Sequence, residues 1–239
     1  MILEVCIDGP EGLLAAREGG ADRVELCSAL DVGGLSPAPA LVTMAGELDM
    51  PAVAMVRSRA GDFVWTDAEV AFMEREVETM QGLGALGVVL GASRPDGRLD
   101  DGVLRRLLSG VDEGREAVLH RAFDLCPDPF EALEQAIDLG FDRILTSGQR
   151  ISAADALPLL AELIDRARGR IDILPGGGIT QENAAAVMRA LPITELHAAC
   201  LRMVPQTDAA VAFGFTHPHR GETDPAAVRA IRAAMLAAR

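Results

Sequence analysis

Short runs of apolar residues recur along the chain, separated by longer stretches that mix apolar and charged residues. We expect the runs to be strands, because aliphatic and β-branched residues suit strands whose outer face is covered by helices. The predicted strands lie near residues 2–7, 22–27, 52–57, 86–90, 117–121, 142–146, 171–174 and 194–197. Helices are expected between them, for example over 66–83 and 128–140, and a last one over 224–238.

Three segments, 18–26, 83–90 and 139–146, share one pattern in which glycine ends a helix and an apolar run follows. Glycine readily takes the left-handed conformation that ends a helix. At the other end, Thr66 and Asp128 are candidate N-caps, and Pro225 suits a first helical turn. Eight strand–helix units in 239 residues predict a (β/α)₈ TIM-type barrel, formed as a single domain over residues 1–239. A doubly wound open sheet is the alternative, but no GxGxxG motif follows the first strand.

The period of two along a strand predicts which polar side chains face the barrel axis. These are Glu4, Cys6 and Asp8 in the first strand, Arg23, Glu25 and Cys27 in the second, His120 in the fifth, and Glu195 and His197 in the eighth. Arg121 is expected at the rim, where the fifth strand ends.

The carboxyl ends of all barrel strands meet at one mouth, where the active sites of such barrels form. The candidates for moving a proton there are Glu25, His120, Asp124 and His197. An internal ion-pair network is the alternative reading, since Glu4, Glu25, Arg23 and Arg121 could neutralise one another.

Two glycine-rich turns predict an anion site at the same mouth. "LTSGQ" (145–149) follows the sixth strand and "PGGGIT" (175–180) follows the seventh, where barrels often bind phosphate. The candidate anion-binding residues are Arg57, Arg121, Ser147, Gly148, Gly176, Gly177 and Gly178. A tight turn that needs positive φ is the structural alternative for the glycines.

Two cysteines predict a metal site. Cys6 and Cys27 end neighbouring strands on the inward face, and two thiolates placed in this way suit Cu(I). Cys200, just past the eighth strand, could supply a third sulfur. Small buried hydrophobic residues are the alternative. The "HPH" at 217–219 is a further metal candidate, but we expect an exposed loop there.

The charge and composition of the chain argue against several classes of function. A net charge of −14 argues against nucleic acid as a partner, because phosphate binding needs a basic face. All 22 basic residues are arginine, so a Schiff-base lysine mechanism is excluded. No apolar run is long enough for a membrane span, and the acidic start "MILEVCIDG" does not fit a signal peptide. We therefore expect a cytoplasmic protein.

Several of these motifs together resemble the copper homeostasis protein CutC family. They are "LEVCIDGPEGLLAAREGGADRVELCSALDVGGLSP", "HRAFD", "DRILTSGQ" and "PGGGI", and the resemblance runs from residue 2 to about residue 203. It implies a single cytoplasmic (β/α)₈-type barrel that forms a homo-oligomer, a dimer or a tetramer, and that handles copper. The residues that match family motifs are Glu25, Cys27, His120, Arg121, Asp124, Ser147, Gly176, Gly177, Gly178 and His197.

The resemblance also implies that Cys6 and Cys27 are the cysteine pair for copper. It departs in "MVRSRAGDF" (55–63), where Ser58 and Ala60 replace proline and glycine and put the rigidity of that loop in doubt. Two hypotheses follow. The principal one is a cytoplasmic protein that holds Cu(I) through Cys6 and Cys27. The alternative is a barrel enzyme that acts on a small anionic molecule, for example a phosphorylated one.

Overall fold

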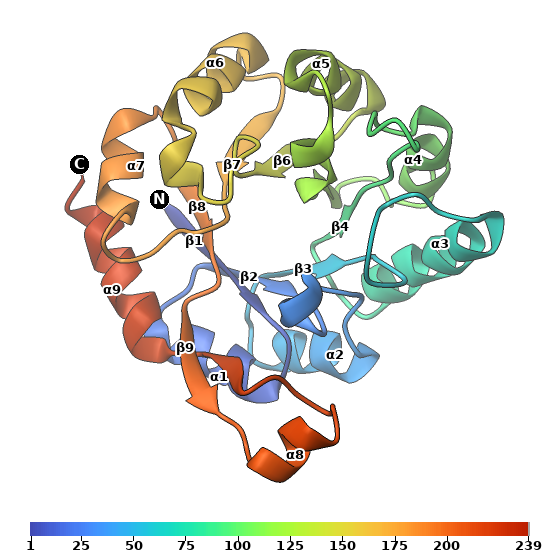
Figure 1. Cartoon of the computed structure of the whole chain (residues 1–239). Coiled ribbons are helices and arrows are strands. Elements are labelled where there is room, and N and C mark those ends of the chain that lie inside the picture. Colours follow the sequence, from blue (N-terminus) through green and yellow to red (C-terminus); the bar gives the residue numbers. More distant parts are fainter. Residues whose placement is uncertain (239) are drawn as a thin grey trace.

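Eight parallel strands follow one another around a barrel in the computed structural model, which describes residues 1–238 (Figure 1). The strands are β1 Ile2–Ile7, β2 Arg23–Leu26, β3 Ala52–Met55, β4 Gly87–Leu90, β5 Glu116–Leu119, β6 Arg143–Thr146, β7 Asp172–Pro175 and β8 Glu195–Ala198. Their order is β7-β6-β5-β4-β3-β2-β1-β8, and an isolated bridge between Gly176 and His197 joins the two outer strands. The (β/α)₈ prediction is confirmed.

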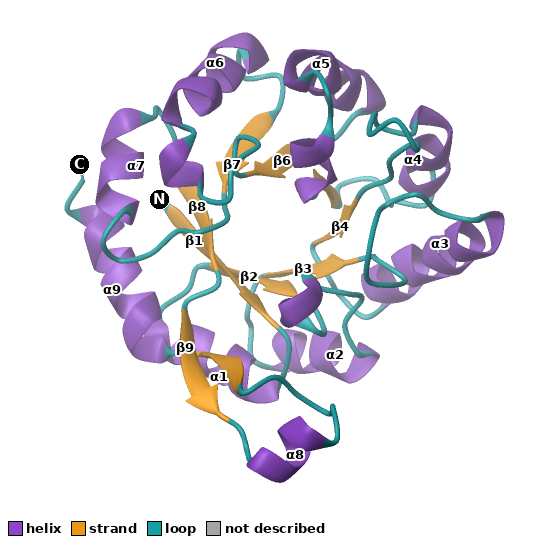
Figure 2. Cartoon of the chain, viewed as in Figure 1, coloured by secondary structure: helices purple, strands orange, loops and turns teal. Residues whose placement is uncertain are grey.

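Helices surround the barrel and cover its outer face (Figure 2). They are α1 Pro10–Gly19, α2 Pro39–Glu47, α3 Asp67–Gly82, α4 Asp101–Leu108, α5 Pro129–Leu139, α6 Leu157–Ala167, α7 Ala184–Ala190 and α9 Pro225–Leu236. Short 3₁₀ turns occur at η1 Leu30–Val32, η2 Arg121–Leu125 and η3 Ala153–Asp155. Thr66 caps α3 in a full capping box, and the Asp128 side chain accepts from two N–H groups at the start of α5, as predicted.

The predicted end of the fifth strand and the predicted direction of Asp8 are wrong. The fifth strand ends at Leu119, because the His120 side chain accepts the Ala122 N–H and starts the turn η2. The first strand ends at Ile7 as predicted, but Asp8, just beyond it, is exposed and accepts the Leu30 N–H instead of facing the axis.

A hairpin arm between β8 and α9 has no counterpart in the predicted elements. Strands β9 Leu201–Pro205 and β10 His219–Thr223 pair antiparallel and carry the short helix α8 Asp208–Ala212 at their tip, away from the barrel (Figure 1). His217 and His219 are exposed on this arm, as expected, although His219 begins a strand.

The core has two parts. The larger part lies between the strands and the helices and includes Leu3, Val5, Val24 and Leu26, the outward residues of β1 and β2. The smaller part lies inside the barrel and consists of Cys27, Val53, Met55, Val89, Val118, Leu145 and Leu174. Among the described residues, none of the helices is long and apolar enough to cross a membrane.

Adjacent leucines on α1 test this packing. Leu13 is fully buried against the barrel, whereas Leu14 is 41% exposed. We expect Leu13→Ala to lower the free energy of unfolding by about 3 kcal/mol, because it removes buried methyl groups and leaves a cavity. Leu14→Ala should cost well under half as much in the same urea titration. Equal losses would contradict the orientation of α1.

Candidate functional site

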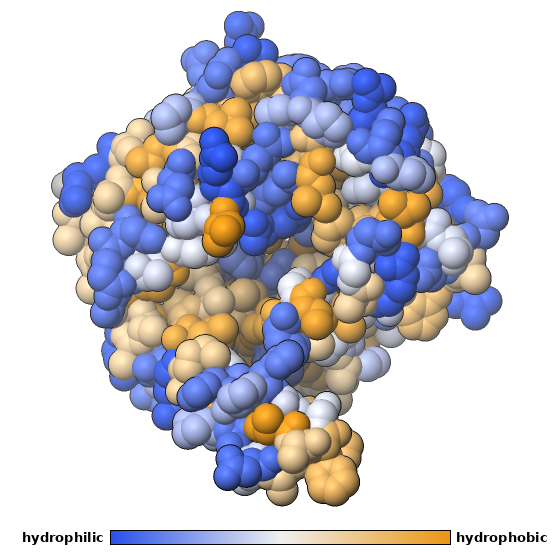
Figure 3. Space-filling view, viewed as in Figure 1, coloured by the Kyte–Doolittle hydropathy of each residue, from blue (hydrophilic) through white to orange (hydrophobic). Residues whose placement is uncertain are grey.

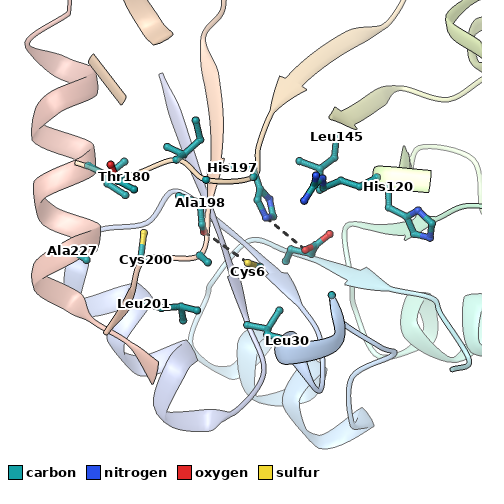
Figure 4. Close-up of a pocket in the computed structure, with 18 of the residues that line it drawn as sticks. Cys6, Leu30, His120, Leu145, Thr180, His197, Ala198, Cys200, Leu201 and Ala227 are labelled. Atoms are coloured by element: carbon teal, nitrogen blue, oxygen red, sulfur yellow. Dashed lines mark hydrogen bonds and ion pairs between the residues drawn. The ribbon is translucent and has the colours of Figure 1, made fainter. Parts of the chain in front are cut away.

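A cavity of about 650 Å³ opens at the carboxyl ends of the barrel strands, and Figure 3 shows the hollow in the surface there. Its wall includes Cys6, Glu25, His120 and His197, which come from four different strands or strand ends (Figure 4). The structure therefore brings together three of the four predicted proton-transfer residues and one of the two predicted cysteines.

A chain of ion pairs lies inside the barrel, and its members Glu4, Arg23 and Arg143 are buried. Arg23 is bonded to Glu4 at 2.5 Å and to Glu195 at 2.7 Å. Glu195 also lies 3.3 Å from Arg143, which contacts Glu116 at 3.0 Å. The predicted network therefore exists around Arg23 and Glu4, but its other members differ from those expected. Arg121 lies outside it, and Glu25 has no arginine partner within 4 Å among the described residues.

His197 connects this network to the cavity. Its Nδ1 lies 2.8 Å from Glu4 Oε1, and its Nε2 lies 3.9 Å from Glu25 Oε2. Burial opposes the charge on both Glu4 and His197, so by itself it would raise the pKa of Glu4 and lower that of His197. The hydrogen bond and charge of His197, with the charge of Arg23, nevertheless hold the pKa of Glu4 at about 2. Burial likewise lowers the pKa of His197, but contacts with Cys6, Glu4 and Glu25 outweigh it and raise that pKa well above 6.5. His197 is therefore held as a cation by its partners.

The environment of Glu25 favours its protonated form, in contrast to that of Glu4. Burial raises its pKa to about 7, and the nearby Glu4 charge acts in the same direction. Its Oε2 accepts from the Cys27 thiol at 3.6 Å, while its Oε1 has no hydrogen-bond partner among the described residues. A buried oxygen without a hydrogen-bond partner is costly.

Cys6, Glu25 and His197 form a candidate metal centre. One ligand atom from each residue lies within 4.8 Å of the others, and all three residues are buried. The register of β1 with β2 and with β8 brings these residues together, because it places Cys6 beside Glu25 and Glu4 beside His197. A histidine that ligates a metal usually donates its second ring N–H to a carboxylate, which is the role that Glu4 can fill.

The other cysteines have different surroundings. Cys27 packs inside the barrel with Val53 and Met55, and burial followed by the Glu25 charge raises its pKa well above 9.0. It contacts the candidate metal centre through Glu25 and does not line the cavity. Cys200 does line the cavity, and burial raises the pKa of its thiol to about 12. The Cys6–Cys27 copper pair stays a prediction.

Asp124, the fourth predicted proton-transfer residue, binds the loop after β6. Its two oxygens accept from the Arg121 guanidinium, the Thr146 hydroxyl, the Ser147 N–H and hydroxyl, and the Gln149 N–H. It does not line the cavity. The motif "HRAFD" is therefore a 3₁₀ turn that orients Arg121 and fixes this loop.

The predicted anion-binding residues separate into two groups. Arg57, Arg121, Gly177 and Gly178 line the cavity. Ser147, Gly148 and Gly176 do not: the Ser147 hydroxyl is bonded to Asp124, a Cβ at Gly148 would meet Ala156, and the Gly176 N–H donates to Thr146. Whether the cavity-lining group binds an anion stays a prediction.

The loop after β3 contains Arg57, which was predicted to face the cavity, and Phe63, which was not. Arg57 donates to the carbonyl oxygens of Val32, Gly34 and Gly61, which fixes the loop although Ser58 and Ala60 depart from the family pattern. Phe63 follows in the same loop, and its ring centroid lies 4.6 Å from that of His120. The position of Phe63 shortly after Arg57 and Arg59 was the signal in the sequence that could have identified it.

Comparisons with known proteins agree on a family. The CutC family model matches residues 1–201. A CutC family protein from Sinorhizobium medicae is 50% identical over 98% of this chain and 96% of its own length, and one from Caulobacter vibrioides is 45% identical over 95% and 94%. The solved CutC structure from Streptococcus agalactiae has a TM-score of 0.77 at 29% identity, covering 83% of this chain and 98% of its own.

A more distant structure shares the fold alone. Thiamine phosphate pyrophosphorylase from Pyrococcus furiosus has a TM-score of 0.58 at 16% identity, over 99% of this chain and 96% of its own.

The environment of Glu25 predicts a pH dependence of stability. Its pKa is about 7 in the folded chain against 4.5 ordinarily, so the folded state keeps a proton that the unfolded state has lost between these values. The free energy of unfolding therefore falls as pH rises from 4.5 to 6.5, by about 2 kcal/mol from this group. His197, whose folded pKa is also raised, adds a loss in the same direction only above pH 6.5.

Glu25→Gln, which imitates the protonated carboxyl, should remove this contribution in the metal-free protein. We expect urea titrations at pH 4.5 and 6.5 to show a growing stability advantage of the variant over the wild type. Glu113→Gln, a change at an exposed residue, is the control and should follow the wild type. If Glu25→Gln and the wild type change in parallel, the raised pKa is wrong.

Proposed function

The chain belongs to the CutC family, and we propose that it binds copper ions at the mouth of its barrel as part of cytoplasmic copper handling. The solved Streptococcus agalactiae relative is named for copper homeostasis, and this supports copper as the ion. The single observation that carries the proposal is the meeting of Cys6, Glu25 and His197 at the cavity wall. Copper is here the cargo of the protein.

The ligand types suit copper that is held and then released. Thiolate and imidazole are preferred copper ligands, and Cys6 and His197 supply one of each. Glu25 adds a carboxylate, a harder ligand that binds Cu(I) less strongly than a third sulfur. The cluster lies on the wall of an open cavity, so an ion can reach it and leave it without unfolding of the barrel.

Glu4 positions the imidazole for this role. With Nδ1–H donated to Glu4 Oε1, the ring directs Nε2 toward Glu25. An incoming ion has to displace the proton from His197 Nε2 and the proton from the Cys6 thiol. Binding therefore releases protons, and the affinity should rise with pH.

Serine substitutions distinguish a copper site formed by Cys6, Glu25 and His197 from one formed by Cys6 and Cys27. Loss of an outer-shell partner alone lowers metal affinity about 10–100-fold, so loss of a ligand in Cys6→Ser should lower Cu(I) affinity by about 100-fold or more. Cys27→Ser should change it much less, since Cys27 reaches the candidate metal centre through Glu25 and does not line the cavity. The measurement is competition with a chromophoric Cu(I) chelator under reducing conditions.

Cys126→Ser is the matched control, because Cys126 is buried but is bonded to Ala122 away from the cluster. Equal losses in Cys6→Ser and Cys27→Ser would assign the ion to the cysteine pair instead. Wild-type affinity in Cys6→Ser would overturn the proposed site.

A further inference from the structure

The cavity is far larger than a metal ion requires, and a second group of polar residues lines it. At about 650 Å³ it has the size of a pocket for a small organic molecule. Cys6, Glu25 and His197 account for one part of the wall. Another part carries Arg57, Phe63 and His120, none of which belongs to the candidate metal centre.

His120 presents one fixed hydrogen-bond donor. Its Nδ1 accepts the Ala122 N–H at 3.1 Å, so the neutral ring must carry its proton on Nε2. Burial, with the charge of Arg57, lowers the pKa of His120 to about 3, which keeps the ring neutral at ordinary pH. The residue is 3% exposed, and Nε2 has no acceptor among residues 1–238.

Arg57 presents a second donor. Its terminal nitrogens are used by the carbonyl oxygens of Val32, Gly34 and Gly61, but its Nε–H finds no partner within the described chain. The side chain is 4% exposed. A buried donor without an acceptor costs about 1–3 kcal/mol. Both residues line the cavity, so a ligand that supplied acceptors to these two atoms would recover this cost.

Packing holds both donors in place. The Phe63 ring contacts both residues: its centroid lies 4.6 Å from that of His120 and 4.9 Å from the guanidinium carbon of Arg57. Gly91 leaves room for the imidazole, because a Cβ there would lie 2.4 Å from His120 Cε1. Neither donor can turn away to find another acceptor without disturbing these contacts.

We propose that Arg57 and His120 bind the carboxylate of a small organic acid, whose apolar body lies against Met55 and Leu145 in the same cavity. Two N–H donors and one positive charge match the two oxygens and the single negative charge of a carboxylate. A phosphate monoester carries one more oxygen and a second charge, which the two unpaired donors of Arg57 and His120 leave unmatched. The inference does not depend on a bound copper ion.

The test uses metal-free protein, kept with a chelator, and benzoate as the probe. With histidine labelled by ¹⁵N, benzoate should shift the His120 Nε2 resonance in a saturable way. The exposed His217 and His219 serve as internal controls and should not respond. Benzamide has nearly the same shape but is uncharged and presents an N–H group to the donors, so it should bind about tenfold more weakly or worse.

Substitutions of His120 test the donor itself. His120→Phe keeps a ring but loses the N–H, and should weaken benzoate binding about tenfold, the loss of one hydrogen bond to a charged group. His120→Gln, which can place an amide N–H near the position of Nε2, should restore most of it. Trp65, the single tryptophan, reports binding in both variants by fluorescence, because its ring lies 6.3 Å from that of Phe63.

Three results would overturn the inference: no response of His120 to benzoate up to its solubility limit, equal binding of benzamide, or undiminished binding by His120→Phe. The wild-type titration decides the question even if His120→Phe does not fold. Because copper is absent throughout, these results are independent of the proposed copper site.

Discussion

The buried pairing of Arg23 with Glu4 is the interaction on which the candidate site depends. Charges inside a barrel are tolerated only when they are paired, and Arg23 satisfies one oxygen of Glu4 while Glu4 holds the His197 ring with the other. The other ring nitrogen, Nε2, then lies on the side of Glu25. The position of the proposed copper ligand is therefore set by charges that lie inside the barrel, behind the cavity.

Much of this arrangement could be predicted because the period of two along a strand is fixed by the backbone. It placed Glu4, Cys6, Glu25 and His197 on the inner face, where the structure finds them buried. The partners across strands could not be predicted in this way. Strand register decides them, and it sets Cys6 beside Glu25, so that Cys27, two residues farther along and just past the end of β2, packs in the apolar interior.

The motif "HRAFD" shows a second limit of sequence reasoning. Its polar residues suggested a strand end with free catalytic groups, but tertiary hydrogen bonds from the loop after β6 occupy Asp124, and His120 caps a 3₁₀ turn. The role of Phe63 depends equally on a contact between distant segments. The arm over 201–223 follows no strand–helix repeat, and the sequence gives no pattern from which its hairpin could be predicted.

¹⁵N NMR of the His197 ring during addition of Cu(I) tests whether Glu4 fixes His197 so that Nε2 is the nitrogen offered to the ion. At neutral pH the metal-free ring should carry protons on both nitrogens, as its raised pKa requires. Copper should then replace the Nε2 proton while Nδ1 stays protonated and bonded to Glu4. A ring that copper leaves unchanged, or that loses its Nδ1 proton instead, would contradict the account.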